Sequence, residues 1–238
     1  SMVSKLLQGD LIIPNFKEFK QNINMIFERS KCNTGGKVAD YIPQLKRVPA
    51  DLFALSVCTI DGQSFDLGDS EQKFCVQSTC KPLNYCLALE EHGVEYVHQF
   101  IGREPSGRGF NELSLNKDGL PHNPMINAGA IMSSALIRPE LNKADRFDFL
   151  MQNWKIACGE DQPRFNNSVY LSEKNTVDRN FALAYFMKET NETKQIGFPE
   201  NTNINDTLDL YFQSCSIEVN TEILSIVAST LANGGVNP

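Results

Sequence analysis

The sequence predicts an α+β fold, in which a small antiparallel sheet is combined with a mainly helical region. Residues 52–59 form an apolar run that is typical of a buried strand. The pair Asp61-Gly62 follows, and this pair favours a tight hairpin turn. Residues 63–67 then form the returning strand. Most of the later chain instead carries apolar residues at helical spacing, so the two kinds of structure are separated along the chain.

The chain of 238 residues is long enough to bury a sizeable core, and we expect one domain over residues 1–238. Residues 37–75 then belong to the sheet region and residues 76–235 to the mainly helical region. Two strands do not make a stable sheet by themselves. We therefore expect the N-terminal residues or residues beyond Pro238 to complete the sheet, and the domain to be incomplete at its C-terminal end.

Helices are predicted where apolar residues recur three or four positions apart. The first helix lies within residues 11–30, ends before Gly35-Gly36, and presents one apolar face made by Phe16, Phe19, Ile23, Ile26 and Phe27. The remaining helices are expected over residues 84–100, from Asn127 onward, over 144–157, from Phe181 onward, over 206–218 and over 220–232, where Asn233-Gly234-Gly235 forms the C-terminal cap.

Three stretches are predicted to be irregular. Residues 102–124 are rich in glycine and proline but lack the glycine spacing of nucleotide-binding loops. A loop of this length in a compact domain is usually functional or mobile. Residues 165–180 are polar and lead into a helix at Asp178-Arg179-Asn180, and residues 190–206 have the composition of a polar linker.

The composition excludes several classes of function. A net charge of −7 disfavours nucleic acid and anionic membranes as partners. The chain has no run of 18 apolar residues, so no transmembrane helix is expected, and residues 1–30 resemble neither a signal peptide nor a transit peptide. The seven cysteines and three histidines show no metal-binding spacing, which argues against a metal site. Unpaired cysteines in apolar surroundings indicate a reduced, intracellular protein.

The chemistry of the chain is expected to centre on Ser78 and Lys81. Residues three positions apart on a helix lie on one face, so the lysine amine can reach the serine hydroxyl and activate it as a nucleophile. Pro82 is tolerated only in the first turn of a helix, which places Ser78 at the helix N-terminus. Backbone N–H groups there can stabilise an oxyanion. The alternative is a serine that merely precedes a helix and a solvated lysine.

Other candidate site residues have ordinary structural explanations when they are taken one at a time. Tyr41 can be a core tyrosine whose hydroxyl is hydrogen-bonded. Asn127 can be the N-cap of the helix that it begins, a position that asparagine favours. Asn180 can belong to a solvated loop and helix cap. These alternatives stay open on local grounds.

The order of short motifs along the chain nevertheless resembles one family, the glutaminases, and most resembles the kidney- and liver-type enzymes of animals. The Ser-x-x-Lys spacing alone also occurs in β-lactamases and penicillin-binding proteins. The motifs that carry the resemblance are Gly36 to Leu45, Gln77 to Pro82, Gly102 to Gly107, His122 to Ala130, Ser172-Glu173, Asp178 to Asn180, Tyr211 to Ser216 and Leu231 to Gly235.

This resemblance implies a serine β-lactamase/transpeptidase-like fold and the hydrolysis of L-glutamine to L-glutamate and ammonia, with no metal and no organic cofactor. Ser78 resembles the acylated nucleophile, Lys81 its general base and Tyr41 a tyrosine beside them. Residues that resemble the family's glutamine-binding set are Ser78, Asn127, Glu173, Asn180 and Tyr211. A carboxylate can pair the ammonium of a free amino acid, and amides and a phenol can bind its carboxylate.

The resemblance also implies a mitochondrial homo-oligomer, a dimer or tetramer, with inorganic phosphate as an activator. The sequence departs from the family at Arg108-Gly109-Phe110, in a loop linked there to phosphate activation and tetramer contacts. Residues 189–200 look longer than their equivalent. The family's second tyrosine, its Lys-Ser-Gly-type segment and its second oxyanion donor do not occur before Pro238.

Two other functions remain as alternatives. The chain can be another Ser-x-x-Lys acyl-transfer hydrolase, such as a β-lactamase or peptidase. It can also be a catalytically inactive fragment that assembles with full-length subunits. Glu173 favours the glutaminase, because an anion in a small closed site suits the ammonium of a free amino acid.

Overall fold

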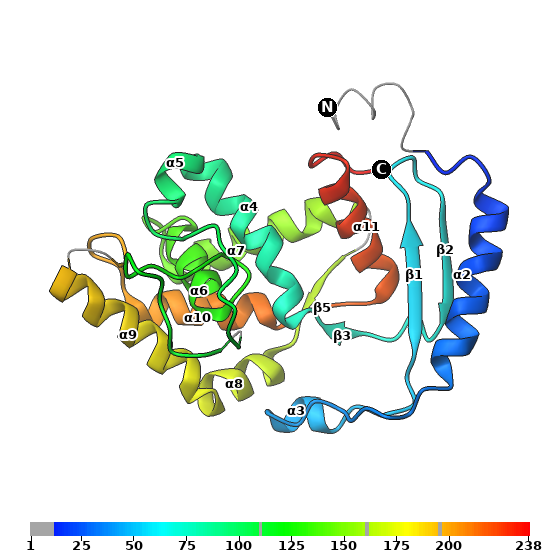
Figure 1. The fold of residues 1–238 in the computed structure, drawn as a ribbon, viewed down its shortest axis with the longest axis horizontal. Coiled ribbons are helices and arrows are strands. Elements are labelled where there is room, and N and C mark those ends of the chain that lie inside the picture. The colour runs from blue at the N-terminus through cyan, green and yellow to red at the C-terminus, as the bar shows by residue number, and fades with distance from the viewer. Residues whose placement is uncertain (1–11, 110, 160–161, 195–196) are drawn as a thin grey trace. The chain divides into compact units, whose positions relative to one another are not determined.

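A computed structural model describes residues 12–109, 111–159, 162–194 and 197–238 of the chain. The chain divides into two compact units, which we call the first and the second unit (Figure 1). The first unit comprises Ser1–Phe74, Gln152–Arg164 and Glu218–Pro238. The second unit comprises Cys75–Met151 and Phe165–Ile217. Each unit therefore contains segments that are distant in the sequence.

The predicted hairpin is confirmed in the first unit. Strand β1 (Ala54–Cys58) pairs antiparallel with β2 (Ser64–Gly68), and Cys58 lies opposite Ser64 at the turn. The turn contains Gly62 with a φ angle of 82°. Glycine adopts this left-handed conformation without the steric penalty that a Cβ atom brings. The first strand is shorter than the predicted 52–59, because it begins at Ala54 and ends at Cys58.

Two helices pack against this hairpin within the first unit. Helix α2 (Phe16–Lys31) contacts β2, and helix α11 (Thr221–Ala232) contacts β1 (Figure 1). The rings of Phe16 and Phe19 both meet Phe65 edge-on. The predicted apolar face of the first helix is confirmed except at Ile26, whose side chain is 54% exposed. At 100° per residue, Ile26 lies at the edge of this stripe, about 20° beyond Phe19.

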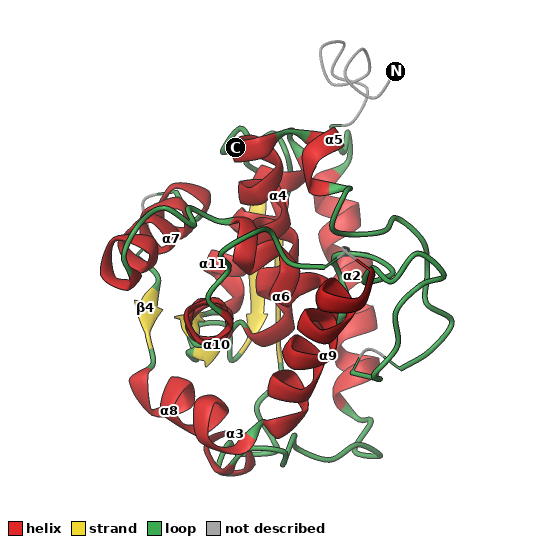
Figure 2. Cartoon of the chain, turned by 90° about the vertical axis from the view of Figure 1, so that its left-hand side faces the viewer, coloured by secondary structure: helices red, strands yellow, loops and turns green. Residues whose placement is uncertain are grey.

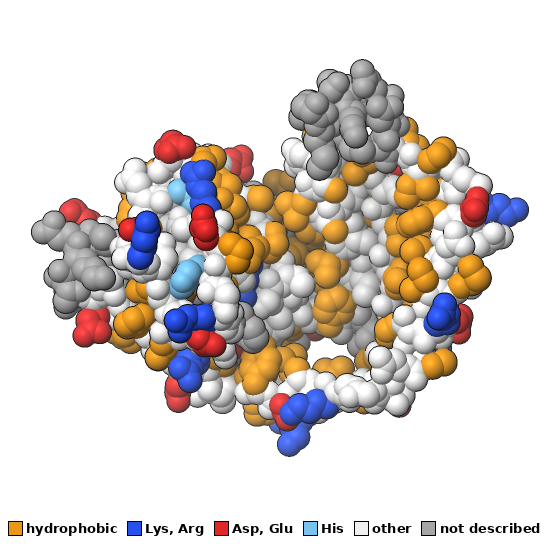
Figure 3. All heavy atoms as spheres, viewed as in Figure 1, with side chains coloured by type: hydrophobic (Ala, Val, Ile, Leu, Met, Phe, Trp, Pro, Cys, Tyr) orange, Lys and Arg blue, Asp and Glu red, His pale blue; other side chains and the backbone are white. Residues whose placement is uncertain are grey.

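Within the described residues, β1 and β2 pair only with each other. All five residues of β1 are half-buried rather than alternately buried and exposed. Figure 3 shows hydrophobic side chains at the surface over these two strands. The expectation that further strands complete the sheet stays a prediction.

The second unit is built around helix α6 (Asn127–Leu136), all of whose residues are buried. Helices α4 (Lys81–His92), α9 (Asp178–Lys194) and α10 (Ile204–Cys215) contact it (Figure 2). Small residues allow this close packing. At Gly129 an added Cβ would collide with the carbonyl oxygen of Asn123, so only glycine fits there. The start of α6 is thereby held against the end of the preceding loop.

Two helix predictions are wrong in detail. Residues 84–100 do not form one helix, because Gly93, with φ of 78°, separates α4 from the short α5 (Val94–Val97). Residues 165–180 are not a loop, because they contain helix α8 (Asn167–Thr176). Its N-cap Asn166 accepts a hydrogen bond from the backbone N–H of Val169. This helix buries few apolar side chains, and the apolar periodicity that would predict it is therefore missing.

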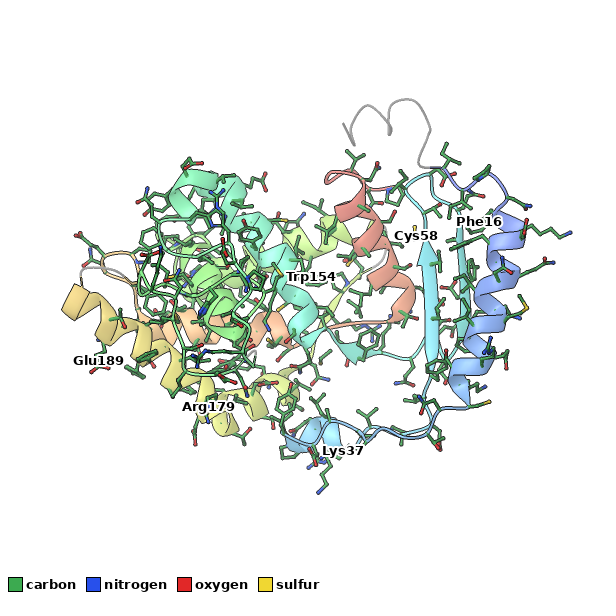
Figure 4. The ribbon with its side chains drawn as sticks, in the orientation of Figure 1. Phe16, Lys37, Cys58, Trp154, Arg179 and Glu189 are labelled. Carbon is green, nitrogen blue, oxygen red and sulfur yellow. The ribbon has the colours of Figure 1, made fainter. Side chains whose placement is uncertain are left out.

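The other elements are short or close to their predicted positions. Helix α9 includes both Arg179 and Glu189 (Figure 4) and ends at Lys194, inside the predicted linker 190–206. The remaining elements are α3 (Pro43–Lys46), the 3₁₀ turn η1 (Gln77–Cys80), α7 (Lys143–Ala157), β3 (Phe74–Cys75), β4 (Arg164–Phe165) and β5 (Ile217–Val219). Strands β3, β5 and β4 form a sheet in that order.

Residues 102–124 contain no helix or strand in their described part, as predicted. Nowhere in the described segments is a helix both long and apolar enough to span a membrane.

Candidate active site

The structure brings Ser78 and Lys81 together in the second unit. The Lys81 Nζ atom lies 2.9 Å from Ser78 Oγ. Ser78 is in the turn η1, and Lys81 is the first residue of α4. A 3₁₀ turn has three residues per turn, so side chains three positions apart are eclipsed and meet directly. Pro82 occupies the first turn of α4, as predicted.

The backbone just before Ser78 has an uncommon conformation. Gln77 has a φ angle of 48°, although it is not a glycine. Such residues pay a steric cost, and they concentrate at functional sites where the surrounding structure holds them in place. This turn leaves the side chain of Ser78 exposed, while that of Lys81 points inward and is only 4% exposed. The hydroxyl is therefore accessible and the amine is shielded from water.

Burial lowers the pKa of the Lys81 amine from its ordinary value, and the neighbouring Cys215 and Cys80 thiols oppose this shift. Desolvation has this direction for any ammonium group, because the charged form loses more hydration than the neutral form. Within the described residues no carboxylate forms an ion pair with Lys81. A larger fraction of neutral amine is therefore present near neutral pH than for an exposed lysine, as a general base requires.

This pKa shift predicts a pH-dependent stability. Between the folded and unfolded pKa values of Lys81, the unfolded chain binds more protons, so the free energy of unfolding rises with pH. The contribution of Lys81 to the free energy of unfolding is fully present above its pKa in the unfolded chain, which is near 10.5. This contribution is lost as the pH falls through the pKa of Lys81 in the folded chain. We expect the stability of the wild-type chain relative to Lys81→Met to increase over this window in urea unfolding experiments.

The control for this experiment is Lys73→Met, which removes an exposed lysine close by in the sequence. It corrects for the general effect of losing one lysine charge. If the stability difference between wild type and Lys81→Met were the same at every pH, the inferred burial of the amine would be wrong.

Two asparagines extend the group. Asn127 Oδ1 accepts a hydrogen bond from Lys81 Nζ at 2.8 Å, and Asn127 Nδ2 donates to Asn180 Oδ1 at 3.2 Å. Ser78, Lys81, Asn127 and Asn180 thus form one continuous chain of polar contacts. The N-cap alternative for Asn127 is wrong, because Ile126 is the N-cap and Asn127 is the first helical residue. Its amide side chain bonds to Lys81 instead of to the helix backbone.

Glu173 and Tyr211 are both buried in the second unit, on α8 and α10. Burial holds the pKa of the Tyr211 phenol well above its ordinary value, and the Cys215 thiol and the Glu173 carboxylate act in the same direction. The phenol is therefore protonated at neutral pH and can donate a hydrogen bond. The Glu173 carboxylate also raises the pKa of the Cys215 thiol, and that thiol in turn raises the pKa of the Lys81 amine.

The thiols of Cys80 and Cys215 are the part of this site that the sequence reasoning missed. The sequence predicts only that the unpaired cysteines of this chain lie in apolar surroundings. Cys80 lies between Ser78 and Lys81 in the turn, and Cys215 follows Tyr211 by one turn of α10. Residues four apart on a helix share a face, and that spacing was the available signal.

Tyr41 belongs to the first unit, whereas the other candidate residues belong to the second unit. Its side chain is 56% exposed, whereas the adjacent Ile42 is fully buried. The alternative of a core tyrosine is therefore wrong. A role for Tyr41 beside Ser78 stays a prediction.

No cluster of His, Cys, Asp or Glu that could hold a metal ion occurs among the residues described. The candidate residues of the second unit carry a hydroxyl, an amine, two amides, a carboxylate and a phenol. These groups can activate a nucleophile and bind a small polar molecule with charges of both signs.

Comparison with solved structures shows the fold class of the chain. Among solved structures, one described as a probable glutaminase superimposes with a TM-score of 0.84 at 32% identity, over 95% of this chain and 71% of that one. A second, described as Mglu in its native form, gives 0.79 at 29% identity over 90% of this chain and 50% of the other. The predicted α+β fold of the serine β-lactamase-like class is confirmed.

The family follows from sequence comparison. The family model described as Glutaminase matches residues 36–238. The mitochondrial liver isoform of glutaminase from Mus musculus is 46% identical over 237 residues, which is 100% of this chain and 38% of that protein. Putative glutaminase 3 of Caenorhabditis elegans is 48% identical over 237 residues, again 100% of this chain and 40% of that protein. The chain belongs to the glutaminase family and spans about two fifths of the length of these relatives.

Proposed function

We propose that the protein hydrolyses L-glutamine to L-glutamate and ammonia through an acyl-enzyme on Ser78. The observation that carries this proposal is the 2.9 Å approach of the buried Lys81 amine to the exposed Ser78 hydroxyl, in a chain of the glutaminase family. A serine hydroxyl is a weak nucleophile unless a base of this kind adjoins it.

The reaction proceeds in two halves. In the first, neutral Lys81 takes the hydroxyl proton while Ser78 Oγ attacks the side-chain amide carbon of glutamine. The carbonyl oxygen becomes an oxyanion, to which the backbone N–H of Ser78 donates. Lys81 then passes its proton to the leaving nitrogen, and ammonia departs. In the second half, water attacks the acyl ester with the same base, releases glutamate and restores Ser78.

The remaining buried groups suit the two charges of a free amino acid. Glu173 pairs the substrate ammonium, since a buried carboxylate favours a cationic partner. Tyr211, kept protonated by its burial, and the amides of Asn127 and Asn180 bind the substrate carboxylate and amide. Tyr41 completes the set as a tyrosine beside the nucleophile. None of these roles needs a metal or an organic cofactor.

The decisive experiment compares substrates. Ammonia release from L-glutamine is measured beside nitrocefin hydrolysis and beside hydrolysis of a peptide amide. Activity on glutamine alone supports the proposal. Hydrolysis of nitrocefin or of the peptide without glutamine turnover would favour another Ser-x-x-Lys hydrolase. Activity on none of them would favour a catalytically inactive fragment that acts in assembly.

Replacing Glu173 tests substrate recognition. If Glu173 pairs the substrate ammonium in a dry pocket, Glu173→Ala leaves that ammonium buried without a partner. Breaking a buried pair costs about 3–5 kcal/mol, so kcat/KM for glutamine should fall by several hundredfold or more. Steady-state ammonia release gives this ratio, and circular dichroism checks the fold.

Glu95→Gln is the matched control, because that side chain is 95% exposed on α5 of the same unit. It should leave kcat/KM unchanged. A Glu173→Ala protein as active as Glu95→Gln would show that Glu173 does not contact the substrate.

The family resemblance supports three further proposals about the whole protein. It assembles as a homo-oligomer, a dimer or tetramer. Inorganic phosphate activates it, and it is located in mitochondria, as the names of its relatives from Mus musculus and Rattus norvegicus say of those proteins. Size-exclusion chromatography and activity measurements with and without phosphate test the first two proposals, and organelle fractionation tests the third.

A further inference from the structure

The second unit contains a large cavity that is separate from the candidate active site. Its volume is about 1130 Å³, slightly above the ~300–1,000 Å³ that is usual for small-molecule pockets. Ala135 of α6 lines it, whereas Asn127, at the other end of the same helix, belongs to the Ser78 group. At 1.5 Å per residue these two positions are about 12 Å apart along the helix. Neither Ser78 nor Lys81 lines the cavity.

The most unusual side chain in the cavity wall is Arg146, near the start of α7. It is only 5% exposed. Its Nε donates to the carbonyl oxygen of Ile137 at 3.0 Å, and its Nη2 donates to that of Ser134 at 2.7 Å. A guanidinium has five N–H donors, and these two bonds use two of them.

No carboxylate in the described part of the chain lies within ion-pair distance of Arg146. Burial lowers the pKa of this guanidinium, and the more distant Asp206, Glu140 and Glu91 only oppose the shift. A buried cation without an anionic partner is costly, and it can therefore pair with an anion that enters the cavity.

The other walls restrict which anion fits. Three aromatic side chains line the cavity: Tyr96, Phe100 and Phe198. The rings of Tyr96 and Phe100 adjoin each other, with centroids 5.2 Å apart. Such walls favour a ligand with an apolar body.

The acidic residues of the cavity wall are Glu140, Glu200 and Asp206. Asp206 is paired with Lys143 at 3.1 Å, and Glu140 with Arg138 at 3.5 Å. Even so, three carboxylates in the wall disfavour a ligand that carries two or more negative charges.

We propose that this cavity is a second ligand site, which binds a small organic monocarboxylate with an apolar body. The ligand carboxylate accepts the remaining guanidinium hydrogens of Arg146. Its apolar part lies against Tyr96, Phe100 and Phe198. The planar fork of arginine matches a carboxylate in geometry, and the aromatic walls provide the buried contact area. This site is independent of the proposed glutamine chemistry, because it shares no residue with the Ser78 group.

Calorimetric titration with 3-phenylpropionate tests the proposal, with its neutral amide and inorganic phosphate as comparisons. The acid should bind at millimolar or lower concentration. The amide should bind at least about tenfold more weakly, because it loses the charge-assisted hydrogen bonds. Phosphate should neither bind comparably nor displace the acid. Absence of binding by the acid, equal binding of acid and amide, or displacement by phosphate would each overturn the proposal.

Two variants test whether the ligand binds in this cavity. Gln99→Glu adds a carboxylate on an exposed residue of the cavity wall and should weaken acid binding about tenfold while leaving the amide unaffected. Gln21→Glu adds the same charge on the exposed surface of α2, in the first unit, and should change nothing. Equal effects of the two variants would contradict binding in this cavity.

Arg146→Lys keeps the positive charge but removes the planar guanidinium. It should also weaken the binding of 3-phenylpropionate. Because Arg146 bonds to the end of α6, that variant can lose stability, and Gln99→Glu keeps the test decisive in that case. The titrations measure binding without turnover, so their failure would leave the proposed glutaminase activity untouched.

Discussion

Replacing Ser78 by alanine is expected to abolish glutamine hydrolysis. The Ser78 hydroxyl is exposed and lies 2.9 Å from the only amine among the described residues that contacts it. Without it, no acyl-enzyme forms, and loss of a nucleophile lowers kcat on the order of 10⁴-fold or more. The measurement is ammonia release by a glutamine-hydrolysing protein that contains these 238 residues.

Thr79→Ala is the matched control for this variant. Thr79 is the adjacent hydroxyl residue, is also exposed, and donates to the backbone carbonyl of Val76 at 2.6 Å. It should retain most of the activity. A second readout is covalent labelling by a glutamine analogue with an electrophilic γ-carbonyl, followed by mass spectrometry. Labelling should be lost in Ser78→Ala and kept in Thr79→Ala, and activity of Ser78→Ala within about tenfold of wild type would falsify the assignment.

Features set by local geometry could be predicted from the sequence. The hairpin follows from Asp61-Gly62 between two apolar runs, and the structure has it with the expected turn. The contact of Ser78 with Lys81 follows from their spacing and from Pro82, since both the 3₁₀ turn and an α-helix place residues three apart side by side. In each case, residues close together in the sequence determine the local conformation.

Features decided by contacts between distant segments could not be predicted in this way. Helix α8 has too few apolar side chains for a periodic signal, and its position depends on packing against α10. From the sequence, Asn127 was equally compatible with an N-cap. The structure shows that its amide oxygen instead accepts a hydrogen bond from Lys81, which lies on another helix. Glu173 was placed in the site by family resemblance alone, because its surroundings come from residues far away in the chain.

The position of α6 explains how these distant segments meet. Its first residue bonds to Lys81 of α4 and to Asn180 of α9, and its buried faces contact α10. Gly129 permits the start of the helix to approach Asn123. Because α6 is buried along its whole length, a larger side chain at Gly129 would displace Asn127, and the polar chain that ends at Ser78 would change with it.

Replacing Lys81 is expected to be as damaging as replacing Ser78, and the replacement by arginine is the most informative. Arginine keeps a positive charge and N–H donors for Asn127, but it is not deprotonated in proteins and cannot act as a base. If Lys81 takes the Ser78 proton, Lys81→Arg should lower kcat on the order of 10⁴-fold or more, as Lys81→Ala should. If Lys81 only holds its neighbours by charge, Lys81→Arg should keep much of the activity.

Two comparisons complete this test in the same ammonia assay. Lys73→Arg changes an exposed lysine nearby and should behave as wild type. The double variant Ser78→Ala with Lys81→Arg should be no less active than Ser78→Ala alone, because residues that act as one unit do not contribute additively. A double variant that lost a further hundredfold would show that Lys81 acts separately from Ser78. The lowered pKa of the buried amine would then have to serve another step, such as protonation of the leaving nitrogen before ammonia departs.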